Sequence, residues 1–257
     1  MYVYSFLASF LILLSSGVPS TIAKEVSGLA TTPWQVEAKN RLETENQVEM
    51  QSQVESQGQV EPQSVSIQDA DSLSRYVELI LDTSQDLRNE LRYSEALSLL
   101  TLPSSIGIDP LASATLLHQR GVILLEMGYY KIAAEEMQSS ISLLNTLDEP
   151  ESTANVYNSL GTLYHAIEDY DRAIRFYNRA EEILQREDVS RFTSPDELRF
   201  KILINSAITL TRQEKFEEAT NGYSLALSVA EQMGDSLNLA AALYNQGNLL
   251  LQAQSPE

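Results

Sequence analysis

The feature that most constrains this chain is a recurring spacing of small and aromatic residues. It is clearest between Ala154 and Gln185, in the stretch ANVYNSLGTLYHAIEDYDRAIRFYNRAEEILQ. Two sets of markers, each on one face of a predicted helix, are Tyr157, Leu160, Gly161 and Tyr164, then Tyr170, Ala173, Tyr177 and Ala180. The polar pair Glu168 and Asp169 predicts a turn between the two sets. We therefore expect two antiparallel amphipathic helices, whose small residues let the backbones approach while the tyrosines fill the flanking gaps.

The same spacing recurs along the chain. The equivalent small residues of the first helix are Ser84, Gly121, Gly161, Ala207 and Gly247, at steps of 37, 40, 46 and 40 residues. Because one such pair cannot bury its apolar faces alone, the repeat predicts stacked helix pairs. We expect nine helices, which begin near residues 72, 92, 110, 130, 151, 170, 195, 216 and 236, and no strand in the repeats.

Capping residues mark several of these helix ends. Asp109 before Pro110 predicts a helix start, and Ser194 with Glu197 predicts a reciprocal capping box. Gly234 and Asp235 predict the end of one helix and the cap of the next. Loops at residues 148–152 and 188–194 are expected to absorb the residues that lengthen the repeat.

This pattern resembles the tetratricopeptide repeat, a unit of about 34 residues with the signature W-x2-L-G-x2-Y…A-x3-F…P. The resemblance covers residues 73–253, with Tyr157 in place of the tryptophan, Tyr177 in place of the phenylalanine and no closing proline. Its longer steps are similar to expanded members of about 40 residues. The resemblance implies an all-α, right-handed α-solenoid of antiparallel helix pairs, with units at residues 77–110, 114–147, 154–187 and 200–233 and a half unit at 240–257. An ordinary helical bundle with accidental small residues stays open as an alternative.

The first 23 residues contain no charged side chain. Their apolar run from Phe6 to Leu14 is short for a membrane span and suits the hydrophobic part of a signal peptide, although no Lys or Arg precedes it. Small residues around Ala23 offer a cleavage point before Lys24. We expect export to a periplasmic, lumenal or extracellular location, with an uncleaved membrane anchor as the alternative.

Residues 24–70 differ in composition from the rest, with hexads such as QVEAKN, QVEMQS and QVESQG. They contain too few apolar side chains to offset the entropy of ordering, so they predict a disordered linker. Val48, Val54 and Val60 recur every six residues as in a parallel β-helix. Gly58 and Pro62 interrupt that pattern, which disfavours this alternative.

The net charge of −19 bears on the choice of partner. Residues 1–70 hold three bases against eight acids, and the remainder holds fourteen against twenty-eight. Such a surface repels nucleic acid and attracts basic proteins or peptides. The absence of cysteine excludes disulfides, thiolate metal sites and cysteine nucleophiles.

The resemblance implies a protein-binding groove lined by the first helix of each pair. The lining residues are expected to be His118, Gln119, Asn158, Thr162, His165, Lys201, Asn205, Arg212, Asn245 and Asn248. Side-chain amides both donate and accept hydrogen bonds, which suits the main chain of an extended peptide. Lys201 and Arg212 are the only cations in this set and belong to one repeat, so the lysine and arginine clamps that some groups of the family use for a carboxyl terminus are poorly matched. An alternative is that surface helices simply tolerate asparagine.

No sequence motif points to an enzyme or to a cofactor. The two histidines, His118 and His165, are expected to lie roughly 10 Å apart by helical rise, too far to share a metal or a proton. The sequence therefore predicts an exported scaffold that binds a peptide or protein in its groove. A membrane-tethered assembly factor is the first alternative, and a solenoid that binds a small apolar ligand is the second. The final helix, with Leu249, Leu250 and Leu251, is expected to take part in self-association.

Overall fold

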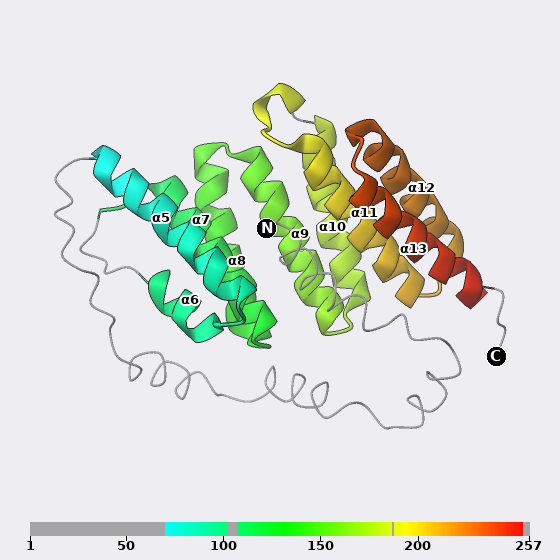
Figure 1. Cartoon of the computed structure of the whole chain (residues 1–257), viewed down its shortest axis with the longest axis horizontal. Helices are drawn as coiled ribbons and strands as arrows, with labels where there is room; N and C mark the ends of the chain where they lie inside the picture. Colours follow the sequence, from blue (N-terminus) through cyan, green and yellow to red (C-terminus); the bar gives the residue numbers. More distant parts are fainter. Residues whose placement is uncertain (1–69, 102–106, 187, 254–257) are drawn as a thin grey trace. The chain divides into compact units, whose positions relative to one another are not determined.

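The computed structural model describes residues 70–101, 107–186 and 188–253 (Figure 1). The predicted leader in residues 1–23 and the predicted linker in residues 24–70, apart from its last residue, lie outside these ranges. Within them the chain forms nine α-helices and one short 3-10 helix, with no strand. None of the described helices has the length and apolar character needed to cross a membrane.

The predicted helices are present and begin within two residues of their expected positions. Their bounds are α5 Ala70–Asn89, α6 Tyr93–Leu99, α7 Pro110–Glu126, α8 Tyr130–Leu147, α9 Pro150–Ala166, α10 Tyr170–Arg186, α11 Pro195–Arg212, α12 Phe216–Met233 and α13 Ser236–Ala253. The 3-10 helix Val189–Arg191 lies between α10 and α11. The all-α prediction is therefore confirmed for the described residues.

The chain divides into two compact units, with the boundary inside α8 after Glu136. In the first unit, α5 packs against α6 and α7, and α6 packs against α7. In the second unit, α9 pairs with α10 and α11 pairs with α12, while α10 contacts α11 and α12 contacts α13. Because the two helices of each pair pack against each other across a three-residue link, they run antiparallel, as the repeat predicts.

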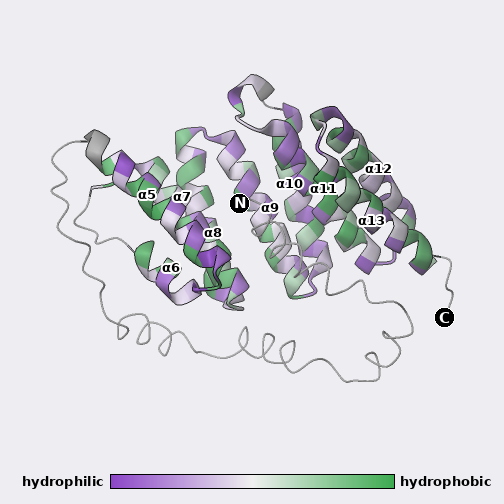
Figure 2. Cartoon of the chain, in the orientation of Figure 1, coloured by the Kyte–Doolittle hydropathy of each residue, from purple (hydrophilic) through white to green (hydrophobic). Residues whose placement is uncertain are grey.

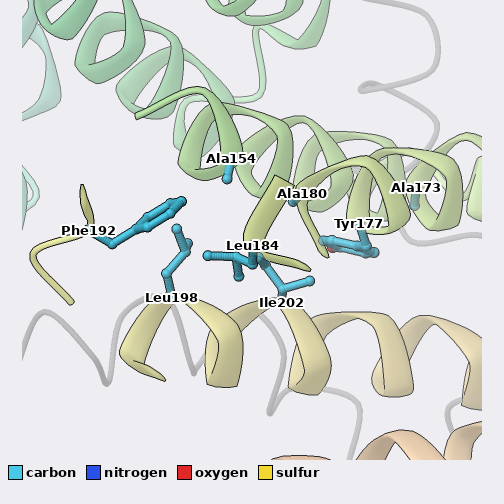
Figure 3. Close-up of a cluster of buried hydrophobic side chains, with 8 residues drawn as sticks. All are labelled: Ala154, Ala173, Tyr177, Ala180, Leu184, Phe192, Leu198 and Ile202. Carbon is cyan, nitrogen blue, oxygen red and sulfur yellow. The ribbon is translucent and has the colours of Figure 1, made fainter. Parts of the chain in front are cut away.

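The second unit has an apolar core between its helix pairs (Figure 3). Figure 3 shows Leu198 and Ile202 pointing from α11 toward Leu184 of α10. The small markers lie inside this core, since Ala154, Ala173 and Ala180 have no exposed surface. Their lack of bulk lets neighbouring helices approach. Hydrophobic and hydrophilic residues alternate along the helices (Figure 2), and burial of the larger apolar side chains stabilises the stack.

The tyrosine markers fill the gaps beside these small residues. Tyr157 and Tyr164 of α9 stack on Phe176 of α10, with ring centroids 6.0 and 5.2 Å apart. The guanidinium of Arg172 lies 4.4 Å from the centroid of the Tyr164 ring. Aromatic and cation–π contacts of this kind add to the burial of apolar surface.

The turns within the helix pairs repeat as well. One residue of each turn has a left-handed backbone, and these residues are Leu91, Gly128, Glu168 and Glu214, with φ of 60, 82, 63 and 60°. They are 37, 40 and 46 residues apart, which are the first three steps of the sequence repeat. Only Gly128 adopts this conformation without steric cost. The left-handed turn is thus a fixed part of the repeat, whatever residue occupies it.

Two of the predicted helix caps are confirmed and one is wrong. The Asp109 carboxylate accepts from the backbone N–H groups of Leu111 and Ala112, both at 2.9 Å. Gly234 ends α12 in a left-handed conformation, and Asp235 then caps α13.

Ser194 makes no side-chain capping bond, so the predicted box with Glu197 does not form. Instead the Glu151 carboxylate, on α9, accepts from the backbone N–H groups of Thr193 and Ser194 at 2.7 and 3.0 Å.

The expected loop at residues 148–152 is also shorter than predicted. Pro150 begins α9, so only Asp148 and Glu149 separate α8 from α9. Proline is favoured in the first turn of a helix because its missing N–H has no helical partner there. The lengthened repeat is accommodated by helices of 17 or 18 residues and by the link between α10 and α11.

Candidate functional site

The candidate site in the second unit is the face shared by α9, α11 and α13, the first helices of successive pairs. Helix α9 contacts α11, and α11 contacts α13, so residues of these helices lie side by side (Figure 1). Eight of the ten predicted groove residues are on these helices: Asn158, Thr162, His165, Lys201, Asn205, Arg212, Asn245 and Asn248. The other two, His118 and Gln119, are on α7 in the first unit.

Two of the predicted asparagines are joined directly. The Asn205 side-chain amide on α11 donates to Oδ1 of Asn158 on α9 at 3.1 Å. Asn158 is 8% exposed, whereas Asn205 is more accessible. The pair therefore connects neighbouring repeats, with Asn158 inside the contact and Asn205 at its surface.

A second polar contact joins the same two helices. Nδ1 of His165 lies 2.8 Å from the Thr209 hydroxyl oxygen, and the Thr209 hydroxyl in turn donates to the carbonyl of Asn205. Burial, reinforced by the positive charge of Arg212, lowers the pKa of His165 to about 4. The imidazole is therefore neutral at neutral pH, and one ring nitrogen donates while the other accepts.

Tyr177 brings α10 into this polar contact. Its hydroxyl donates to the hydroxyl oxygen of Thr162 at 3.5 Å and lies near the Thr209 hydroxyl. Burial raises the pKa of Tyr177, so its hydroxyl stays protonated. Thr209 has no exposed surface and was not among the predicted site residues. Thr209 follows Ala207 by two residues, about 200° around the helix, so it lies on the side of α11 away from Ala207. Its bond to a histidine 44 residues earlier has no local signal.

The two predicted cations differ in their surroundings. The Lys201 ammonium donates to the Glu197 carboxylate one turn earlier, at 2.7 Å. Arg212 is exposed at the end of α11, and its charge acts on His165 and on Tyr170. Lys201 and Arg212 are about three helical turns apart on α11, so the structure does not bring them together as a clamp.

The asparagines of α13 are less constrained than Asn158. Asn245 donates to the carbonyl of Ala241 in its own helix at 2.9 Å. Asn248 lies one turn later and is partly exposed. Both therefore present amide groups on the last helix of the shared face.

In the first unit, His118 is buried next to a buried ion pair. Nε of Arg88 lies 3.0 Å from Oε2 of Glu126, and the two side chains are 13% and 9% exposed. Burial, together with the charge of Arg88, lowers the pKa of His118 to about 4. Gln119 is partly exposed beside it. The role of His118 and Gln119 as binding residues stays a prediction, and burial leaves His118 little surface to offer.

The arrangement as a whole offers hydrogen bonds rather than reactive groups. The described residues contain no cluster of three or more His, Asp or Glu side chains that could hold a metal ion. The accessible predicted groups of the shared face are amides, a hydroxyl, the neutral imidazole of His165, the Arg212 guanidinium and a lysine already paired with a carboxylate. Such groups can bind a polar chain without chemical change to it.

Comparison with known proteins agrees with this architecture. The tetratricopeptide repeat family model matches residues 112–186, which contain most of α7 and all of α8, α9 and α10. Nothing among the curated proteins matches the sequence.

Several solved structures are similar to this chain. The crystal structure of BtubC (BKLC) from P. vanneervenii has a TM-score of 0.55 and 22% identity, covering 67% of this chain and 69% of that one. MamA MSR-1 has a TM-score of 0.38 and 18% identity, covering 69% and 98% of the two chains. MamA AMB-1 has a TM-score of 0.40 and 17% identity, covering 72% and 95%. The likeness to BtubC shows a shared fold, and the other two scores are too low to add to it.

The family match and the structure support each other at particular residues. Gly161 and Tyr177, two signature positions, are in contact between α9 and α10, inside the matched range. Over residues 112–186, this chain therefore matches the tetratricopeptide repeat family in both sequence and helix packing.

Proposed function

We propose that this protein is an exported scaffold that binds an extended segment of a protein partner along the face of α9, α11 and α13. Tetratricopeptide repeats are typically protein-interaction scaffolds without catalytic activity, and stacked repeats present extended binding surfaces. The first helices of successive pairs run side by side here, which is the arrangement such a surface needs.

The observation that carries this proposal is the bond between Asn205 and Asn158. This bond fixes the orientation of the Asn205 amide, because one of its two N–H groups is used and the carbonyl oxygen points away from that donor. The fixed amide keeps one donor and one acceptor for a peptide main chain, and less entropy is lost when a partner binds. Asn245 and Asn248 would continue the same recognition on α13.

The proposed partner is basic. The segment after residue 70 holds twice as many acidic as basic residues, so its field attracts positively charged proteins and speeds their association. Such attraction weakens with salt, because a screening length is only about 8 Å at physiological ionic strength. The amides would then fix the register of the bound segment, whereas charge brings it to the surface.

A photo-crosslinking residue placed at Asn245 or at Asn248 in the full-length protein tests the binding face in the native cells. Ser224 and Ser228, which are exposed on α12, are the matched control positions. We expect one discrete adduct from the α13 positions and none from α12, with less adduct when Asn205→Ala is added. Equal adducts from both helices, or adducts from α12 alone, would contradict the proposed face.

Mass spectrometry of the mature amino terminus tests export separately. A mature start near Lys24 would support a cleaved signal peptide. An intact Met1 in the membrane fraction would support the alternative, an assembly factor that is tethered through its first 23 residues.

A further inference from the structure

The outer face of α13 differs from every other surface of the described chain. Nine large apolar side chains are exposed in that part, and five of them are on α13: Leu237, Leu243, Tyr244, Leu250 and Leu251. The opposite face of the helix packs inward through Asn238, Ala241, Ala242 and Leu249. Among the described residues, no helix covers the outer face. Single exposed apolar residues are ordinary, but a group of this kind marks a contact surface.

The arrangement of small and large side chains on the outer face of α13 indicates the shape of the surface that would fit it. Gly247 lies at its centre, and a β-carbon there would meet nothing within 4 Å. Leu243 and Leu250 lie on one side of the glycine, and Tyr244 and Leu251 on the other, by the 100° step of an α-helix. The repeat places Gly247 at the position that Gly161 has in α9, where α10 covers it. The face is therefore shaped to receive another helix at close range.

We infer that this face pairs with the same face of a second copy, as two antiparallel α13 helices related by a two-fold axis beside Gly247. Leu243 precedes the glycine by four residues and Leu250 follows it by three. The axis therefore places Leu243 of one copy opposite Leu250 of the other. Tyr244 precedes Gly247 by three residues and Leu251 follows it by four, so Tyr244 of one copy lies opposite Leu251 of the other. A two-fold contact requires a self-complementary surface of this kind.

Charge also favours a second copy as the occupant. The chain has a net charge of −19, so most pairs of surfaces from two copies repel each other. Helix α13, SLNLAAALYNQGNLLLQA, contains no charged side chain in its 18 residues. It is the only described helix of which this is true. Two copies can meet there without bringing like charges together, whereas a basic partner would gain nothing from a neutral face.

Sedimentation velocity of the full-length protein, over about 1–100 µM, measures the association, since a contact through one helix is small and reversible. We expect a dimer that dissociates on dilution. Leu250→Lys acts twice in a symmetric contact and should raise the dimer Kd about 100-fold or more. The matched control is Leu79→Lys, on an exposed leucine of α5, which should leave the Kd unchanged. A monomer at every concentration would overturn the inference.

Substitutions at Gly247 provide two further tests, which distinguish the two-fold pairing from non-specific hydrophobic association of α13. Gly247→Ala has free space in the monomer and should raise its thermal stability, yet it should weaken the dimer, because the added methyl groups separate the two helices. Gly247→Cys introduces the only cysteine, and under mild oxidation it should give a disulfide-linked dimer, since the axis brings the two Cα atoms within about 7 Å. Ser224→Cys on α12 is the control and should stay monomeric. An unchanged Kd for Gly247→Ala, or equal crosslinking of both cysteine variants, would overturn the two-fold pairing.

Discussion

The ring of Tyr177 on α10 occupies the space in which a β-carbon on Gly161 of α9 would lie. The ring is buried, and its hydroxyl donates to the Thr162 hydroxyl oxygen. Tyr177 therefore cannot turn away without breaking this hydrogen bond or leaving a cavity. The glycine and the tyrosine depend on each other across the helix pair.

Gly161→Ala should therefore lower the free energy of unfolding by about 2 kcal/mol, since overpacking of a well-packed contact costs about 1–3 kcal/mol. Gly247→Ala is the matched control, because it adds the same methyl group to a helix where nothing lies within 4 Å. That variant should be about 1 kcal/mol more stable as a monomer. Urea unfolding at one dilute concentration compares the two. Equal effects at both positions would contradict the contact.

In the next repeat, the glycine of the helix pair is on the second helix, α12, instead of the first. Ala207 stands where α9 has Gly161, and a β-carbon on Gly222 of α12 would lie 3.0 Å from the β-carbon of Ala207. We expect Gly222→Ala to be more favourable when Ala207→Gly is also present. The difference, about 1 kcal/mol of coupling, is read from a double-mutant cycle of unfolding free energies. Additive effects would show that the two methyl groups do not compete for space.

The left-handed turns predict stabilising substitutions. Glu168 and Glu214 have positive φ, at an expected cost of about 1 kcal/mol for a residue with a β-carbon. Glu168→Gly and Glu214→Gly should therefore raise the melting temperature. Glu182→Gly makes the same change inside α10, where glycine is unfavourable, and should lower it. Differential scanning calorimetry distinguishes these outcomes, and a loss of stability at both turns would contradict the prediction.

The histidines predict how stability depends on pH. In the folded chain the pKa of each histidine is about 4, against 6.5 for a free imidazole. Burial is the larger cause for both, and the positive charge of Arg88 for His118 and of Arg212 for His165 adds to it. Between these two values the unfolded chain binds more protons, so the free energy of unfolding falls as pH is lowered from about 6.5 to about 4. Each histidine contributes up to about 3 kcal/mol to that loss, and above pH 6.5 the contribution is constant.

His165→Gln should therefore reduce the difference in unfolding free energy between about pH 7 and pH 4.5, relative to the unsubstituted protein. Burial raises the pKa of Glu126, so this residue changes the unfolding free energy with pH in the opposite direction. The comparison of variant and parent therefore isolates the contribution of the histidine. The measurement is urea unfolding at the two pH values. The same pH dependence in both proteins would contradict the buried neutral state of His165.

Substitutions of Asn158 and Asn205, which are hydrogen-bonded to each other, distinguish a role in stability from a role in partner binding. Asn158→Ala should cost about 1–2 kcal/mol of stability, because it removes a buried amide and leaves the Asn205 donor without its acceptor. Asn205→Ala should cost less, since Asn205 is closer to solvent. Thermal unfolding gives both values, and crosslinked adduct from α13 gives binding. Equal stability losses with unchanged binding would assign both residues to the repeat contact alone.

The helix pairs follow from the sequence because spacing along a helix determines which residues share a face. Gly161, Tyr177 and Ala180 could be placed in this way without knowledge of their surroundings. Spacing does not give the depth of a residue in a contact. Asn158 and His118 were predicted to line an open groove, and both are buried.

Contacts between distant residues account for the other differences. Ser194 has the local signature of a cap, but the Glu151 carboxylate reaches the backbone N–H groups that start this turn. A carboxylate accepts stronger hydrogen bonds than a hydroxyl. Glu151 precedes them by more than forty residues, and no short window contains both. Thr209 was missed for the same reason, since its partner His165 is on another helix.

The link between α10 and α11 is the longest in the second unit, and its attachments determine how it responds to proteases. Arg191 donates to the carbonyl and carboxylate oxygens of Asp148, and Phe192 is only 8% exposed. A protease must draw several residues around the cleaved bond into an extended form. Trypsin acting after Arg191 must first break these bonds, together with those to Glu151, and extract the phenylalanine from the core. Limited digestion should therefore spare the junction that looks most vulnerable from its length, and an intact fragment spanning α9 to α12 is the expected product.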